Sequence, residues 1–132
     1  MALGNLRWVV VEDVMVTFAT PGEIDNQSLT AWTKDIKAKP VTRLLGANVG
    51  VVEANSGQRK LAVDTVKGKG MPVAIVSDQA LTRGVVTAAS WLGANIRAFS
   101  WHELSAAATF LQMTPSLQDK VIDALMKLRN DV

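Results

Sequence analysis

Five consecutive residues, Pro72-Val-Ala-Ile-Val76, form an apolar run without a single polar side chain. A run of this length and composition is typical of a strand that is buried on both faces of a parallel sheet. Parallel neighbours in a sheet are joined by crossover connections, which are usually helices and almost always right-handed. The run therefore predicts an α/β fold, in which helical segments flank this strand along the chain.

Strand-like and helical segments do alternate along the chain. Residues 6–11 and 14–19 are rich in β-branched residues around Glu12-Asp13, which predicts a hairpin. Further strands are predicted over 41–45, 72–76 and 95–99, and residues 46–56 are expected to form a loop or an extended segment. Caps and apolar spacing predict helices from Asp25 or Asn26 to Pro40, over 57–68 and 79–92, between Ser100 and Thr114, and after Ser116.

This order of elements predicts one small α/β domain over residues 1–132. A length of 132 residues suits a single domain, and an apolar content of 48% supports a packed core. We expect a four- to five-stranded, mainly parallel sheet with an N-terminal hairpin and flanking helices. Residues 116–132 are expected to add a C-terminal helix, whose apolar stripe either packs on the domain or forms a homodimer.

The chain contains no cysteine and a single histidine, His102. Disulfides, thiolate metal sites and cysteine nucleophiles are therefore excluded. A formal charge of +2 is too small a surplus to indicate nucleic-acid binding. No stretch has the roughly 20 apolar residues of a membrane span or the form of a signal peptide. We accordingly expect a cytoplasmic protein with no cofactor, no metal, no nucleic-acid partner and no membrane span.

Polar residues at two predicted helix starts are the candidate site. Asn55, Ser56, Gly57 and Arg59 open the second helix, where free backbone N–H groups favour an anion and Arg59 adds a forked donor. The alternative is that Ser56 is simply the N-cap and Gly57 a tight-turn residue, and we expect Ser56 to act mainly as a cap.

Asp78 and Arg83 lie at the next strand-to-helix junction. Ligands of open α/β sheets gather at the carboxyl ends of the strands, which is where this junction is predicted to lie. The alternative is that Ser77-Asp78 caps the third helix and that Arg83 is a solvated helix residue. Trp32 and Trp91 lie on apolar helical faces and are expected in the core, as are Val73, Ile75 and Val85. His102 has no partner at a spacing that indicates catalysis.

Four segments in a fixed order resemble a known family. They are Asn55-Ser-Gly-Gln-Arg59, Met71-Pro-Val-Ala-Ile-Val-Ser-Asp78, Arg83-Gly-Val-Val-Thr-Ala-Ala-Ser-Trp91, and Ile96-Arg-Ala-Phe99 followed by Glu103-Leu104. Their order and spacing resemble the STAS domain of bacterial anti-sigma-factor antagonists, and more closely the SpoIIAA-like, or STAS/SEC14-like, group of small bacterial proteins. The resemblance covers residues 6 to 113.

The resemblance implies a regulatory or protein-interaction domain that is not an enzyme, with a protein partner. Its antagonist members carry a phosphorylated serine after an aspartate, at a position that looks like Ser56. Asn55 stands where that aspartate is expected, so we predict no working phospho-switch. The SEC14 side of the resemblance implies the alternative function, a binding protein for a lipid or other small apolar molecule. An apolar cavity would favour this alternative, and a solid core with an exposed apolar patch would favour protein interaction.

Overall fold

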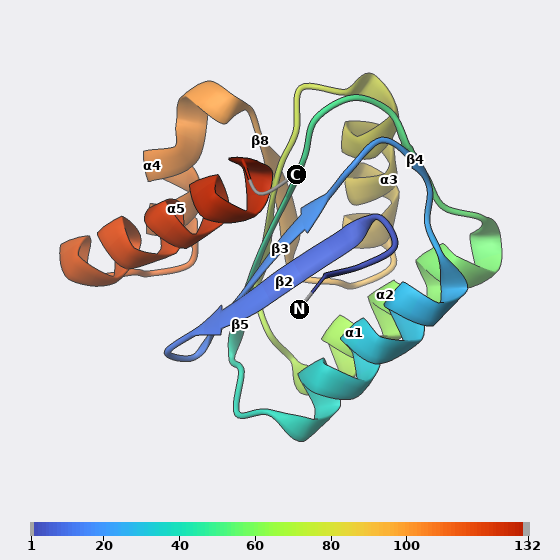
Figure 1. Cartoon of the computed structure of the whole chain (residues 1–132), viewed down its shortest axis with the longest axis horizontal. Helices are drawn as coiled ribbons and strands as arrows, with labels where there is room; N and C mark the ends of the chain where they lie inside the picture. Colours follow the sequence, from blue (N-terminus) through green and yellow to red (C-terminus); the bar gives the residue numbers. More distant parts are fainter. Residues whose placement is uncertain (1, 131–132) are drawn as a thin grey trace.

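The computed structural model describes residues 2–130, which form a central sheet with helices on both faces (Figure 1). Six strands form the main sheet in the order β1-β2-β3-β5-β7-β8, and β4 pairs with β6 in a separate two-stranded sheet. The strands are β1 (Ala2–Leu3), β2 (Leu6–Val11), β3 (Val14–Ala19), β4 (Gly22–Glu23), β5 (Arg43–Asn48), β6 (Val52–Glu53), β7 (Val73–Val76) and β8 (Ile96–Phe99). The helices are α1 (Asn26–Ala38), α2 (Ser56–Lys69), α3 (Ala80–Trp91), the 3₁₀ turn η1 (Trp101–Glu103), α4 (Leu104–Phe110) and α5 (Pro115–Asn130).

The predicted fold class is confirmed. Strands β3, β5, β7 and β8 are parallel neighbours, while β2 and β3 form the predicted antiparallel hairpin with the predicted bounds. The two-residue strand β1 extends the sheet beyond the hairpin. Crossover helices connect the parallel strands, as the apolar run at 72–76 requires.

One face of the sheet is closed by α4 and α5. Strand residues such as Val16, Phe18, Val76 and Phe99 pack there against the apolar stripe of α5. That stripe is Leu117, Val121 and Leu125, all buried. The C-terminal helix therefore packs on the domain, which is the first of the two arrangements expected for it.

The opposite face is covered by α1, α2 and α3 (Figure 1). Helix α1 buries Leu29, Trp32 and Ile36 in a second cluster with Trp8 and Met15. Helix α2 packs mainly against α1, whereas α3 packs mainly against β8. Helices α2 and α3 therefore pack mainly against different elements and not against each other, which leaves space between them for the site.

The predicted bounds of the third strand are wrong. The structure places it at Arg43–Asn48 rather than 41–45, so residues 46–48 belong to the sheet and not to the loop or extended segment expected after the strand. Its pairing with β3 continues as far as Ala19 opposite Asn48. The strand was predicted to end before Gly46 because glycine usually weakens a strand. In the structure Gly46 pairs with β3 on one side and with β7 on the other, which keeps it in the sheet.

The predicted cap of the fifth helix is also wrong. The helix begins at Pro115, one residue before the expected cap Ser116. The hydroxyl Oγ1 of Thr114 accepts a hydrogen bond from the backbone N–H of Leu117, at 3.2 Å. Proline suits the first helical position because it has no N–H group to satisfy there, so Thr114 is the capping residue.

Three residues expected in the core are not fully buried. Trp91 is 82% exposed at the end of α3, whereas Trp32 is buried as expected. Ile75 and Val85 are only partly buried, although Val73 and Val76 on the same strand as Ile75 are fully buried. Ile75 of β7 and Val85 of α3 both border a space between the sheet, α2 and α3 that side chains do not fill completely.

Candidate functional site

The strands carry small or polar residues at one end of the face between α2 and α3. In β3 and β5 alternate side chains point to opposite faces, which places Thr17, Gly46 and Asn48 on this face. On the opposite face, which α4 and α5 cover, the strands carry large side chains, including Phe18 and Phe99. The sequence therefore leaves too little side-chain volume to fill this end of the sheet beneath the helices.

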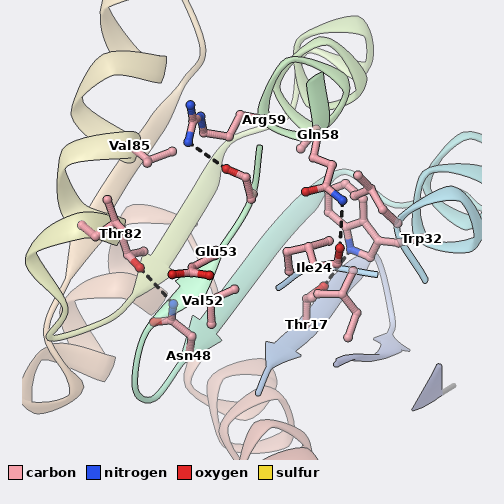
Figure 2. A pocket seen from close by; sticks show the side chains of 15 residues that line it. Thr17, Ile24, Trp32, Asn48, Val52, Glu53, Gln58, Arg59, Thr82 and Val85 are labelled. Carbon is pink, nitrogen blue, oxygen red and sulfur yellow. Dashed lines mark hydrogen bonds between the residues drawn. The ribbon is translucent and has the colours of Figure 1, made fainter. Parts of the chain in front are cut away.

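A cavity of about 440 Å³ occupies this space. Figure 2 shows its walls: Ile24 and residues of α1 lie on one side, α3 lies opposite, and β6 and the start of α2 lie between them. Its lining is largely apolar, with a few polar side chains. The lining residues are Leu6, Thr17, Ile24, Leu29, Trp32, Asn48, Val52, Glu53, Ala54, Gln58, Arg59, Ala62, Leu81, Thr82 and Val85.

A second chamber of about 220 Å³ continues the cavity toward the sheet. Both chambers are lined by Thr17, Trp32, Ala62, Thr82 and Val85, so the two adjoin each other, and together they are here named the central cleft. The inner chamber is lined by aliphatic side chains of the strands and of α2 and α3, together with Trp32 of α1 and two threonines. A groove of about 870 Å³ between α2 and α3 adjoins the cleft.

The cleft has a polar end at the carboxyl terminus of β5. Asn48 is a buried residue, with 6% of its surface exposed. Its Nδ2 donates a hydrogen bond to Thr82 Oγ1 at 3.0 Å, and its backbone oxygen accepts one from Trp101 Nε1 at 2.9 Å. Within residues 2–130, its Oδ1 is buried without a hydrogen-bond partner. An unsatisfied buried acceptor costs free energy, so this atom needs an explanation.

Glu53 and Arg59 bring charge to the mouth of the cleft. Both are exposed and both line the larger chamber. The guanidinium of Arg59 donates to the backbone oxygen of Ala54 at 2.8 Å, and Figure 2 shows it near Val85. In the described part of the chain, Glu53 forms no ion pair or side-chain hydrogen bond. In Figure 2 its carboxylate faces the end of the cavity where Asn48 lies.

Asn55, and not Ser56, caps the second helix. The Asn55 side chain accepts a hydrogen bond from the backbone N–H of Gln58 at 2.8 Å, and Gln58 Oε1 accepts from the Asn55 N–H at 3.0 Å. This capping box corrects the expectation that Ser56 is the N-cap. Asparagine and serine cap equally well, but only Asn55 has a glutamine three residues later to complete the box.

The other candidates on α2 lie at the edge of the cleft. Ser56 is the first residue of the helix, is exposed, and lines the groove between α2 and α3 together with Arg59. Gly57 lies in the first helical turn without a left-handed backbone angle, so it is not a tight-turn residue. Gln58 is buried and donates to the backbone oxygen of Ile24, which fixes this helix start against the segment before α1.

Asp78 and Arg83 lie apart from the cleft lining. Asp78 Oδ1 accepts a long hydrogen bond of 3.4 Å from the backbone N–H of Trp101. Arg83 Nη1 donates to the backbone oxygen of Ser77 at 3.2 Å. The expected cap at Ser77-Asp78 is wrong in detail, because α3 begins at Ala80 and its N-cap residue, Gln79, makes no side-chain capping bond. Both residues therefore stabilise the β7–α3 loop.

Sequence reasoning missed Asn48, Glu53 and Thr82. The signal for Asn48 was present: it is a polar residue directly after an apolar strand, at the edge where ligands of α/β sheets gather. The predicted strand ended at residue 45, so Asn48 was not recognised as the last residue of the strand. Glu53 and Thr82 had no sequence signal, since each is one polar residue among many on a segment without a motif.

Residues 2–130 contain no cluster of three histidine, cysteine or carboxylate side chains that could hold one metal ion. His102 lies exposed in η1. Throughout the same residues, each helix is too short or too polar to cross a bilayer.

The site is interpreted from its own geometry, because the comparisons with known proteins give no match. The candidate features are an apolar cleft, a buried acceptor on Asn48 and two exposed charges at the mouth. The resemblance to STAS domains depends on the order of the quoted segments and stays a prediction. A scan against protein-family models finds no match to this sequence, and a search of curated proteins finds none either.

Proposed function

We propose that this protein binds a small, largely apolar molecule in the central cleft and does not transform it. The observation that carries this proposal is the pair of adjoining, largely apolar chambers between the sheet and α1, α2 and α3. Its larger chamber, about 440 Å³, lies within the range of roughly 300–1,000 Å³ that small-molecule sites have. A few polar groups in an apolar lining are also typical of such sites.

The hydroxyl groups of the lining support binding without chemistry. Thr17 Oγ1 accepts a hydrogen bond from Trp32 Nε1 at 3.0 Å, and Thr82 Oγ1 accepts one from Asn48. A nucleophilic hydroxyl needs an adjacent base to activate it, and these two partners are donors rather than bases. The cleft therefore offers shape and apolar surface to a ligand, with hydrogen bonding at its polar end.

A cavity-filling substitution tests the proposal. Ala62 on α2 lines both chambers, so Ala62→Leu fills the cleft where the chambers meet. The matched control is Ala106→Leu, on the exposed surface of α4. With N-phenyl-1-naphthylamine as a neutral fluorescent probe, we expect saturable one-to-one binding to the wild type and to Ala106→Leu. Binding to Ala62→Leu should fall at least tenfold, and equal binding to all three proteins would contradict the proposal.

A second candidate function is the regulatory protein interaction that the STAS resemblance implies. It is favoured by apolar side chains on α3 and just after it, where Leu81 is 52%, Trp91 82% and Leu92 67% exposed. Exposed aromatic and aliphatic residues of this kind occur in protein interfaces. We propose no phospho-switch at Ser56, because Asn55 replaces the aspartate of the antagonists and its side chain is occupied by the capping box.

Sedimentation of Trp91→Ser against the wild type tests this candidate for a homodimer. If Trp91 lies in the interface of a homodimer, the wild type should sediment as a dimer and the variant as a monomer. A wild type that remains monomeric at high protein concentration would exclude a second copy as the partner on this surface.

A further inference from the structure

The groove between α2 and α3 has one apolar wall. That wall is a single face of α3, continued by Leu92 directly after the helix, and none of its lining residues is charged. Four of these residues are exposed, so nothing within residues 2–130 covers the wall. They are Leu81, Gly84, Ala88 and Leu92. Exposed apolar faces of this kind mark surfaces that bind a partner.

The opposite wall, on α2, is cationic. It carries Arg59, Lys60 and Lys67 against one carboxylate, Asp64. Lys60 and Asp64 form an ion pair with 2.7 Å between Nζ and Oδ2, so they compensate each other. Arg59 and Lys67 each donate to a backbone oxygen at 2.8 Å, and these acceptors are neutral. The groove therefore retains two positive charges beside its apolar wall.

The dimensions of the groove suit one helix. The apolar wall follows α3 over 12 residues, or about 18 Å, which is about three turns. Arg59 and Lys67 are separated by about 12 Å along α2, or about two turns. Midway along α3, a side chain at Gly84 would meet no atom within 4 Å, so the space there is open. Small residues at such a point let a second helix approach closely.

The two walls together decide the kind of partner. A second copy of the chain that docks through the same groove would bring Arg59 and Lys67 of both copies together, and like charges repel. A membrane is flat on this scale, so it cannot fill a groove between two helices. An amphipathic helix can enter the groove, and acidic residues on one of its flanks would complement the cationic wall.

We propose that the groove between α2 and α3 binds an amphipathic, acidic helix of a partner protein. Its apolar stripe packs on α3 around Gly84 and Ala88, and carboxylates two turns apart face Arg59 and Lys67. This inference rests on the protein-interaction candidate described above and specifies the class of partner. It does not depend on what the central cleft binds.

Three stapled helical peptides of 18 residues test the inference. They share one leucine stripe and carry glutamate, glutamine or lysine at the flanking positions two turns apart. Fluorescence anisotropy of the labelled peptides gives their dissociation constants at 50 mM and 500 mM NaCl. We expect the glutamate peptide to bind at least fivefold more tightly than the glutamine peptide at low salt, and the lysine peptide to bind most weakly. High salt should reduce the difference, because it screens exposed charges.

Two pairs of substitutions locate the binding. Ala88→Arg places a long side chain in the groove and should weaken the glutamate peptide at least tenfold, while Thr87→Arg, at an exposed position of α3 outside the lining, should not. Lys67→Glu should weaken the same peptide about fivefold, while Lys34→Glu on α1 makes the same change of charge elsewhere. All four positions are exposed, so the variants should keep the melting temperature of the wild type.

The central cleft provides an independent readout. Ala88 and Lys67 line neither of its chambers. Binding of N-phenyl-1-naphthylamine should therefore be unchanged in Ala88→Arg and Lys67→Glu. If both variants lose this probe together with the peptide, the groove and the cleft are not separate sites and the inference is wrong.

The remaining outcomes separate this inference from the candidate function beneath it. If none of the peptides binds, protein interaction at this groove and the inference both fail. If all three bind equally, the groove binds apolar helices but the acidic partner is refuted. Binding of the glutamate peptide that Ala88→Arg leaves unchanged would place it elsewhere.

Two further measurements address the other occupants. The protein should not co-sediment with phosphatidylcholine vesicles that contain 30% phosphatidylglycerol. Co-sedimentation that Lys67→Glu abolishes would make an anionic membrane the partner and overturn the inference. A wild type that sediments as a dimer, with Ala88→Arg as a monomer, would place a second copy in the groove and overturn it as well.

Discussion

Replacing Asn55 with alanine removes the side chain that begins α2. Asn55 Oδ1 accepts from the backbone N–H of Gln58 at 2.8 Å, and alanine cannot replace this acceptor. Replacing Ser56 leaves the capping box intact, because the Ser56 hydroxyl takes no part in it. Adjacent substitutions of similar size should therefore have different effects on stability.

The magnitude follows from the bonds that each change removes. Loss of an asparagine N-cap costs about 1 kcal/mol, within a range of 0.5–2 kcal/mol. For a domain of this size, a loss of about 1 kcal/mol lowers the melting temperature by about 4 °C. Ser56 is exposed, so Ser56→Ala should change the free energy of unfolding by less than about 0.5 kcal/mol. Asn55→Asp should keep most of the stability, since aspartate also caps and suits the positive end of the helix dipole.

Urea denaturation followed by circular dichroism at 222 nm measures these differences. The expected order of stability is wild type, Ser56→Ala and Asn55→Asp close together, with Asn55→Ala clearly lower. If Ser56→Ala loses as much free energy as Asn55→Ala, the hydroxyl supports the helix start and the assignment of the cap to Asn55 is wrong.

Three further predictions concern stability. The guanidinium of Arg43 and the hydroxyl of Thr42 hold the pKa of Asp13 below its ordinary value of 3.8, so this pair stabilises the fold above that value. Asp13→Asn should cost under about 1 kcal/mol at pH 7, since the carboxylate is partly exposed, and the difference from wild type in urea titrations should shrink as the pH falls below 3.8 and the carboxylate becomes protonated in the folded protein. Leu125→Ala should cost about 2–5 kcal/mol in the same titrations, because Leu125 is fully buried between α5 and the sheet, and a negligible change would show that α5 is not part of the core. Trp91→Ala should leave the melting temperature of the monomer within about 2 °C of wild type, since Trp91 is mostly exposed, and a large drop would contradict that exposure.

The fold class could be predicted because the strongest signals are local. The apolar run at 72–76, the hairpin pattern at 6–19 and the stripe of α5 each specify an element and the face that it buries. The helix starts were harder to predict, because several neighbouring polar residues can cap. At Asn55 and at Thr114 the choice depends on which side chain meets a free N–H group, and adjacent residue types do not decide that.

The cleft could not be predicted from the sequence. It arises because α2 packs mainly against α1 and α3 mainly against β8, a fact of tertiary packing rather than of any one segment. Val85 and Ile75 have the apolar spacing of core residues, and periodicity does not reveal that the space beside them is unfilled. The predicted strand ended at residue 45, so Asn48, the last residue of β5, was not recognised as the polar end of the site.

The two faces of the sheet give this protein different tolerance to mutation. The buried stripe of α5 and the strand residues beneath it supply a closed core, so almost any change of volume there is costly. The residues that line the cleft on α2 and α3 border an unfilled space, where larger or smaller side chains cost less. Descendants of such a chain can therefore acquire new ligand preferences by replacing Ala62, Val85 or their neighbours while the closed face preserves the fold.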